Sequence, residues 1–201
     1  MAHRNPGSRP DVDLFVVAAR GRAYTAYTML FLATKLTGSR HLICPNYLVD
    51  ESELAIVYHR DLFTAHQLVS SLPYSGQGTY EAFCLANEAW VRPFFPAFAP
   101  RDAQPSAPQP SKAQYVAELA LRPAGRLAEE SLRWAWRARL RRRAATAVRG
   151  DVILGDGILK LHLSDYRRTV LERFAARLEP LRARFGGAVD IDRTGLPPVG
   201  T

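Results

Sequence analysis

The first hundred residues alternate between short apolar runs and longer segments with helical spacing. The run at 11–17 (DVDLFVV) is rich in β-branched and aromatic residues and too short for a helix, so it predicts a strand. Tyr24, Tyr27 and Phe31 recur at helical spacing in the segment that follows. The other predicted elements of this half are helices at 22–37, 61–72 and 79–89 and two tightly joined strands at 41–49 and 53–58. This half is therefore expected to be mixed α/β, with Pro45 at a sheet edge or a bulge.

The second hundred residues are mainly helical in pattern. The segment 126–148 carries an apolar row through Leu132, Trp136 and Leu140, spaced by four residues, beside a parallel row of arginines. Apolar runs on each side of a Gly-Asp-Gly sequence predict a β-hairpin over 151–162. The last predicted helix follows Ser164 and has an apolar stripe made of Tyr166, Val170, Phe174 and Leu178.

Proline separates the two halves. Six of the 14 prolines lie between residues 93 and 110, a composition that favours extended backbone over regular elements. The sequence therefore predicts four parts: a mixed α/β domain at 1–96, a linker at 97–113, a basic helical domain with one hairpin at 114–187, and a flexible tail at 188–201.

Charge, like proline, is distributed unevenly along the chain. The chain has 27 Lys and Arg against 19 Asp and Glu, a net charge of +8, and its first 100 residues carry eight of each sign. The whole excess therefore lies beyond residue 100 and suggests an anionic partner for the second half. The longest uncharged apolar run has 12 residues, whereas about 20 are needed to span a bilayer. Because both cysteines also lie in apolar surroundings, we expect a cytoplasmic protein without a membrane span.

Two carboxylates open the first predicted strand. Asp11 and Asp13 are two residues apart, so their side chains should point to the same face. Neighbouring carboxylates repel unless a cation lies between them, and Mg²⁺ is held in proteins by one or two carboxylates together with substrate phosphates. Gly7 and Ser8, just before the strand, could offer backbone N–H groups and a hydroxyl to phosphate oxygens. The alternative is a pair of solvated acids at the start of a strand.

Five segments share their order with a known family. They are Gly7-Ser8, DVDLFVV from Asp11, CPNYLV from Cys44, RDLFTA from Arg60 and NEAWVRPFFP from Asn87. This order, over about residues 7–98, resembles the bacterial nucleotidyltransferase-domain proteins of the polymerase β superfamily. In that family a helix and a strand precede the Asp-x-Asp strand; we expect this chain to lack them, because only Arg9 and Pro10 separate Ser8 from Asp11.

The resemblance implies a Mg²⁺-dependent enzyme that moves a nucleoside monophosphate from a nucleoside triphosphate to a hydroxyl acceptor. Asp11 and Asp13 would hold two Mg²⁺ ions, and Gly7 and Ser8 would hold the triphosphate. In-line displacement between two metal ions would then stabilise the charge that develops as pyrophosphate leaves.

The third catalytic carboxylate of the family comes from the strand after the helix. In this sequence that strand contains only Asn46, which could bind the nucleotide as a hydrogen-bond acceptor but is a poor base. Asp50, just beyond the strand, is the other candidate and is expected to complete the catalytic set with Asp11 and Asp13.

The competing interpretation is a catalytically inactive relative whose basic second half binds nucleic acid or a partner protein. Arg133, Arg137 and Arg141 form a basic row on one helix, with Trp134 and Trp136 interleaved. Arginine binds phosphates in a bidentate manner and tryptophan offers a stacking face, so the row could bind a polyanion. A solvated basic face, with Trp136 in the core, is the simpler alternative.

Other catalytic motifs are not expected. His59 and His66 have no third ligand at a suitable spacing, so the sequence predicts no zinc site. No serine lies in a nucleophile-elbow context, and neither Cys44 nor Cys84 belongs to a cluster of Cys and His at metal-ligand spacing, which disfavours serine and thiol hydrolases.

Overall fold

The computed structural model describes residues 12–101, 112–146, 151–162 and 166–185. Within these ranges, helices surround one mixed sheet, which confirms the expected α/β class. The elements in chain order are β1 (Val12–Ala18), α1 (Ala23–Leu36), the 3₁₀ turn η1 (Ser39–His41), β2 (Ile43–Asp50), α2 (Leu62–Ser70), α3 (Gln77–Val91), α4 (Lys112–Ala145), β3 (Asp151–Leu154), β4 (Ile158–His162) and α5 (Arg167–Phe185).

The sheet joins both halves of the chain. Its strand order is β1-β2-β4-β3, with β1 and β2 parallel and the other two pairs antiparallel. Parallel strands need a crossover connection, which α1 provides. The hairpin β3–β4 lies beyond the predicted linker at 97–113, yet it pairs directly with β2. The expected division into domains at 1–96 and 114–187 therefore does not correspond to two separate sheets.

The segment 53–58, expected as a strand, is a loop. The buried side chain of Asn87 on α3 satisfies its backbone instead: Asn87 Oδ1 accepts from the N–H of Ile56 at 2.8 Å, and Nδ2 donates to the carbonyl of Leu54 at 2.8 Å. These bonds hold the segment against α3, and β2 pairs with β4 instead.

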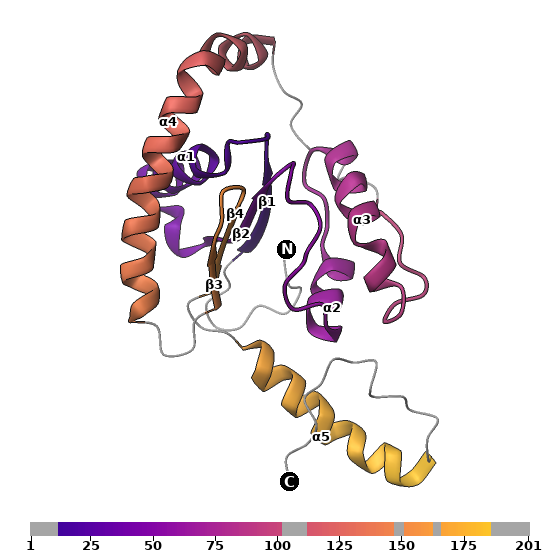
Figure 1. The fold of residues 1–201 in the computed structure, drawn as a ribbon. Helices are drawn as coiled ribbons and strands as arrows, with labels where there is room; N and C mark the ends of the chain where they lie inside the picture. Colours follow the sequence, from indigo (N-terminus) through magenta and orange to yellow (C-terminus); the bar gives the residue numbers. More distant parts are fainter. Residues whose placement is uncertain (1–11, 102–111, 147–150, 163–165, 186–201) are drawn as a thin grey trace.

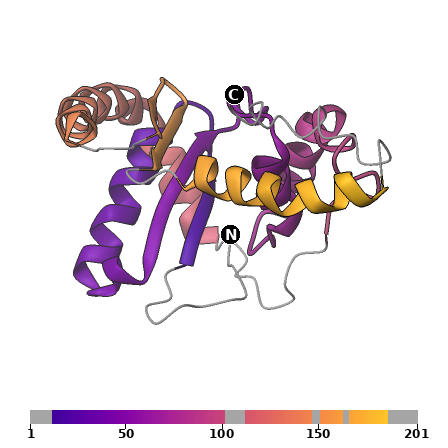
Figure 2. The same ribbon diagram turned by 90° about the horizontal axis from the view of Figure 1, so that it is seen from below.

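The helices form two layers, one on each face of the sheet. Figure 1 shows α1 and α4 on one side of the strands and α2 and α3 on the other, with α5 below them, and Figure 2, seen from below, shows α5 crossing in front. Each face has its own core. The α1/α4 core is centred on Ala18, Ala23, Tyr24, Tyr27, Leu48, Leu140 and Leu159, and the α2/α3 core on Ile56, Ala65, Leu68, Phe83, Cys84, Val91 and Phe98.

Pro45 lies in a central strand and is accommodated by a bulge. The register pairs Asp13 with Cys44 and Phe15 with Tyr47, so β2 uses one residue more than β1 over this stretch. The ladder to β4 begins only at Tyr47, so it does not need the N–H that proline lacks. The expected bulge is thus confirmed, although β2 is not an edge strand.

Helix α4 is fixed to α1 by a buried carboxylate. No side chain of its own caps the N-terminus of α1. Instead Glu129, 6% exposed, accepts from the backbone N–H groups of Tyr24 and Thr25, each at 2.8 Å, and from the Thr25 hydroxyl at 2.6 Å. The indole N–H of Trp136 also donates to Thr28 Oγ1 at 2.8 Å. These bonds satisfy helix-terminal donors that would otherwise be orphaned.

The apolar pattern predicts the buried residues correctly in α4 but not in α5. In α4 the row through Leu132, Trp136 and Leu140 packs on the α1/α4 core, as expected. In α5 the buried residues are Leu171 and Ala175. The predicted α5 stripe is mostly exposed, at Tyr166, Val170 and Phe174. No helix in the described ranges is long and apolar enough to cross a bilayer.

We expect Glu129→Gln to lower the free energy of unfolding by about 2 kcal/mol, because the charged acceptor of the Tyr24 and Thr25 backbone N–H groups is lost. Glu130→Gln is the matched control: this neighbouring carboxylate is exposed and pairs with Arg133 one turn away, so its removal should cost less than about 0.5 kcal/mol. Urea unfolding of both variants measures the difference. Equal effects would contradict the capping role of Glu129.

Candidate functional site

A small cavity of about 60 Å³ lies at the end of the sheet where β1 begins. The topology explains which residues meet there. β4 runs antiparallel to β2, so its last residues return to the start of β1 and β2, and β3 starts beside them. The lining residues are Asp13, Leu14, Phe15, Tyr47, Ile56, Tyr58, Phe63, Thr64, Gln67, Asp151, Lys160, His162 and Arg167.

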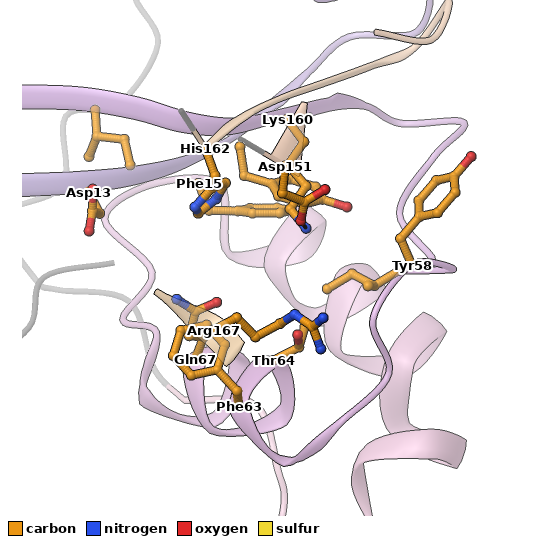
Figure 3. Close-up of a pocket in the computed structure, with 13 residues that line it drawn as sticks. Asp13, Phe15, Tyr58, Phe63, Thr64, Gln67, Asp151, Lys160, His162 and Arg167 are labelled. Atoms are coloured by element: carbon orange, nitrogen blue, oxygen red, sulfur yellow. Dashed lines mark hydrogen bonds and ion pairs between the residues drawn. The ribbon is translucent and has the colours of Figure 1, made fainter. Parts of the chain in front are cut away.

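Two groups of polar side chains face each other across this cavity. Figure 3 shows Asp151, Lys160 and His162 on the strand side, opposite Thr64 and Arg167 on the side of α2 and α5. Figure 3 also places Asp13 to one side of both groups. The cavity therefore combines carboxylates with cationic side chains, while aromatic rings supply much of the rest of its wall.

The strand-side group is built on a buried ion pair. Lys160 Nζ bonds to Asp151 Oδ2, and His59 Nε2 lies 3.1 Å from the same oxygen. Burial alone would raise the pKa of Asp151, but the hydrogen bond and charge of Lys160, together with His59, outweigh it and hold that pKa below its usual range. His59 reaches this position with a φ of 54°, a left-handed conformation that is costly for a residue other than glycine.

The opposite group ties α5 to α2. Asp61 is buried and caps α2, since its Oδ1 accepts from the Thr64 N–H at 2.9 Å. Its other oxygen, Oδ2, pairs with Arg167 at the start of α5. Arg167 thus lines the cavity in a fixed position, next to the helix that contributes Phe63, Thr64 and Gln67.

An aromatic wall closes the sheet side. The rings of Phe15 and Tyr47 stack with centroids 5.1 Å apart. Burial, and next the negative charge of Asp151, raise the pKa of Tyr47 to about 12. Its hydroxyl therefore stays protonated over the physiological pH range and can act as a hydrogen-bond donor.

The structure brings some of the expected site residues together. Asp13 lines the cavity. Asn46 lies in the bulge of β2, between the partners of Asp13 and Phe15, so its backbone is at the same end of the sheet. Asp11, Gly7 and Ser8 lie outside the described residues, so their roles stay predictions.

Asp50 does not belong to this site. The register places it opposite Ala18, five residues beyond Asp13, which is about 16 Å along a strand. Two carboxylates that share one Mg²⁺ must each approach it to about 2 Å, so Asp50 and Asp13 cannot do so. The expectation that Asp50 completes the catalytic set is therefore wrong.

The role of Asp50 is to hold the far end of the sheet. It is 3% exposed, and its carboxylate accepts from the N–H groups of Gly21 and Ser52, each at 2.8 Å. A side chain at Gly157 would place a Cβ 2.9 Å from this carboxylate, which explains the glycine of the β3–β4 turn. Asp50 was expected just beyond the strand, but it is the last residue of β2, and its carboxylate binds two loop N–H groups.

Several lining residues were not found from the sequence, above all Asp151, Lys160, His162 and Arg167. They follow the predicted linker, and nothing local shows that their segment returns to β2. One signal was present: in ILKLH, Lys160 and His162 alternate with Leu159 and Leu161, which puts both polar side chains on one face of a strand.

The basic row of α4 is partly used within the fold. Arg133 Nη1 and Arg137 Nη2 lie 3.0 and 2.8 Å from Asp156 Oδ1 in the hairpin turn, and Arg137 Nε donates to the Tyr24 hydroxyl at 3.0 Å. Arg141 also lines a surface hollow of about 300 Å³ with them, beside Trp134, which is 78% exposed. Replacing the whole row would therefore disturb the hairpin as well as the surface charge.

A search for similar proteins found no match: no family model, no curated protein and no solved structure matches this chain. The residues of the site must carry any functional conclusion by themselves. Among the described residues, no group of three His, Cys, Asp or Glu side chains is placed to hold a metal ion.

Asp151→Asn should destabilise the protein by about 3 kcal/mol at pH 7, since it leaves Lys160 buried without its anionic partner. A lowered folded-state pKa contributes stability that is present above the unfolded pKa and lost as pH falls through the folded value. The difference between wild type and variant should therefore shrink below about pH 4. Urea titrations between pH 3 and 7 test this. A difference that does not change with pH would rule out the ion pair as its source.

Proposed function

We propose that the chain is a nucleotidyltransferase-like protein that binds a nucleoside triphosphate with Mg²⁺ at the cavity beside Asp13 and transfers the nucleoside monophosphate to a hydroxyl acceptor. The observation that carries this proposal is the meeting of Asp13 with Lys160 and Arg167 around one cavity. A carboxylate for a divalent cation and two cations for phosphate oxygens are the groups that this chemistry needs.

The size of the cavity sets how a nucleotide would bind. About 60 Å³ holds only a few water molecules, so a phosphate group fits inside but a whole nucleotide does not. The base and sugar would then lie over the opening, where Tyr58 is 46% exposed and offers a stacking face.

The described residues fit Mg²⁺ only in part. Asp13 would supply one hard oxygen ligand, with Thr64 and Gln67 as neutral oxygen donors in the same lining, and Asp11 would add a second carboxylate. Mg²⁺ is often held by one or two carboxylates plus substrate phosphates, so the site supports an ion that arrives with the nucleotide. When bound, the metal would stabilise charge on the transferring phosphoryl group.

The chain's own residues would orient the reactants. Lys160 is held by Asp151 and Arg167 by Asp61, so both cations are fixed before a ligand arrives. Preorganised charges of this kind favour the developing negative charge without reorganisation. Tyr47, protonated at neutral pH, can donate a hydrogen bond from the cavity wall.

Thermal unfolding with a panel of nucleoside triphosphates, with and without Mg²⁺, tests the proposal. A ligand at 100 times its Kd should stabilise the fold by about 2.7 kcal/mol. Asp13→Asn should weaken binding at least tenfold, leaving about 1.4 kcal/mol at the same concentration. Mg²⁺ alone should have little effect, because no group of three His, Cys, Asp or Glu side chains among the described residues is placed to hold it.

Two control variants make this result specific. Glu81→Gln changes an exposed carboxylate on α3 and should leave stability and binding as in wild type. Asp50→Asn should lower the unfolding temperature but keep the full shift on adding nucleotide, since its carboxylate holds the opposite end of the sheet. No shift with any triphosphate, or an equal shift in Asp13→Asn, would reject the proposed function.

Binding of nucleic acid by α4 is the second candidate. Its support is the hollow of about 300 Å³ where Trp134 stands exposed beside Arg137 and Arg141. An exposed indole among arginines suits stacking of a base together with a phosphate contact. This function needs no catalytic residue and corresponds to an inactive relative.

For that candidate, Arg141→Gln combined with Arg142→Gln should reduce the log–log salt slope of single-strand binding by about one to two units, because each lost phosphate contact is worth about 0.7. These arginines are exposed, whereas Arg133 and Arg137 hold the hairpin turn. Fluorescence anisotropy with labelled oligonucleotides at several salt concentrations gives the slope. Absence of binding at about 50 mM salt would exclude this function.

A further inference from the structure

Another hollow lies on the opposite face of the sheet from the Asp13 cavity, between α1, α4 and the strands. We call it the α1–α4 cavity. Its volume is about 230 Å³. It is lined by Tyr27, Phe31, Thr34, Arg40, Ile43, Pro45, Leu140, Arg143, Val152 and Leu161.

The lining is apolar inside and cationic at the opening. Tyr27, Thr34 and Leu140 are buried and form the floor. Thr34 offers little polarity there, because its hydroxyl already donates to the backbone carbonyl of Leu30 at 2.9 Å. The charged residues of this lining are Arg40 and Arg143, and both are exposed. The lining that the structure describes contains no carboxylate.

Arg40 is held at this opening by an aromatic contact. Its guanidinium carbon lies 4.5 Å from the centroid of the Phe31 ring, which itself lines the cavity. A cation over a ring face is attracted by the ring quadrupole, which holds this guanidinium beside the cavity. The apolar wall and the cationic rim are thus adjacent parts of one structure.

We propose that the α1–α4 cavity binds a small amphiphilic anion, with an alkyl or aryl body inside and a carboxylate or phosphate head at Arg40 and Arg143. An apolar hollow deprives its wall of dispersion contacts, which an alkyl chain restores. Small-molecule sites commonly combine such a lining with a few placed polar groups. The site is separate from the Asp13 cavity and does not depend on nucleotide binding.

Isothermal titration calorimetry with hexanoate, octanoate and decanoate tests the apolar part. Each added methylene should tighten binding by roughly two- to fourfold until the cavity is full. Octyl phosphate and octanol test the head group: octanol should bind at least tenfold more weakly than octanoate, because it forms no charge-assisted hydrogen bond. The ratio of octyl phosphate to octanoate affinity then tells whether the preferred head is a phosphate or a carboxylate.

Variants locate the site. Arg40→Gln and Arg143→Gln should each weaken octanoate binding about three- to tenfold and leave octanol binding unchanged. Arg142→Gln is the matched control, since Arg142 is an exposed arginine of α4 that does not line the cavity. Val152→Phe should fill the hollow and abolish binding of the longer chains, with circular dichroism to check the fold.

The proposal is overturned if decanoate binds no more tightly than hexanoate, or if octanol equals octanoate. It is also overturned if Arg142→Gln weakens binding as much as Arg40→Gln, because surface charge alone would then explain the effect. If Val152→Phe does not fold, the two arginine variants decide the outcome, because their side chains are exposed.

Discussion

The buried carboxylate of Glu129 is the contact on which the arrangement of the two halves depends. Helix α1 begins without a side-chain cap of its own, and its first N–H groups would be orphaned without a partner. That partner comes from α4, 105 residues further along the chain from Tyr24. Once α4 is fixed there, the chain that follows it returns to the sheet, where β4 can pair with β2. One charge–dipole contact thus joins α4 to the helix that leads into β2.

Contacts in the same region use part of the net charge of +8 within the fold. Arg133 and Arg137 both bind Asp156, and Arg137 also donates to Tyr24, whose own hydroxyl donates to the carbonyl of Gly155 at 2.8 Å. These arginines fix the hairpin turn to α4 and α1. The basic row predicted from the sequence thus includes two arginines with a structural role. The exposed arginines after Ala138 are the ones available to a polyanion.

The sequence predicted local elements well and their long-range partners poorly. Strand β1, helices α1 to α3 and the β3–β4 hairpin follow from periodicity, turn residues and caps, which are local properties. The segment 53–58 is a loop whose backbone bonds to Asn87 on α3, and a side chain that acts from another helix leaves no local pattern. The site divides in the same way. Asp13 was found from its own strand, whereas Lys160 and Arg167 became visible only once the hairpin was placed.

The bulge at Pro45 gives the two faces of the sheet their different chemistry. In a regular strand, Ile43, Pro45 and Tyr47 would share one face, because side chains alternate with a period of two. The extra residue changes this: Ile43 and Pro45 line the α1–α4 cavity, whereas Tyr47 lines the Asp13 cavity and stacks on Phe15. Without the bulge, the Tyr47 ring would enter the α1/α4 core and Leu48, fully buried there, would turn toward the ion pair of Asp151 and Lys160. A one-residue shift would thus bury the Tyr47 hydroxyl without a partner and place the aliphatic side chain of Leu48 next to charged groups. The order of residues in β2 itself therefore selects the bulged register.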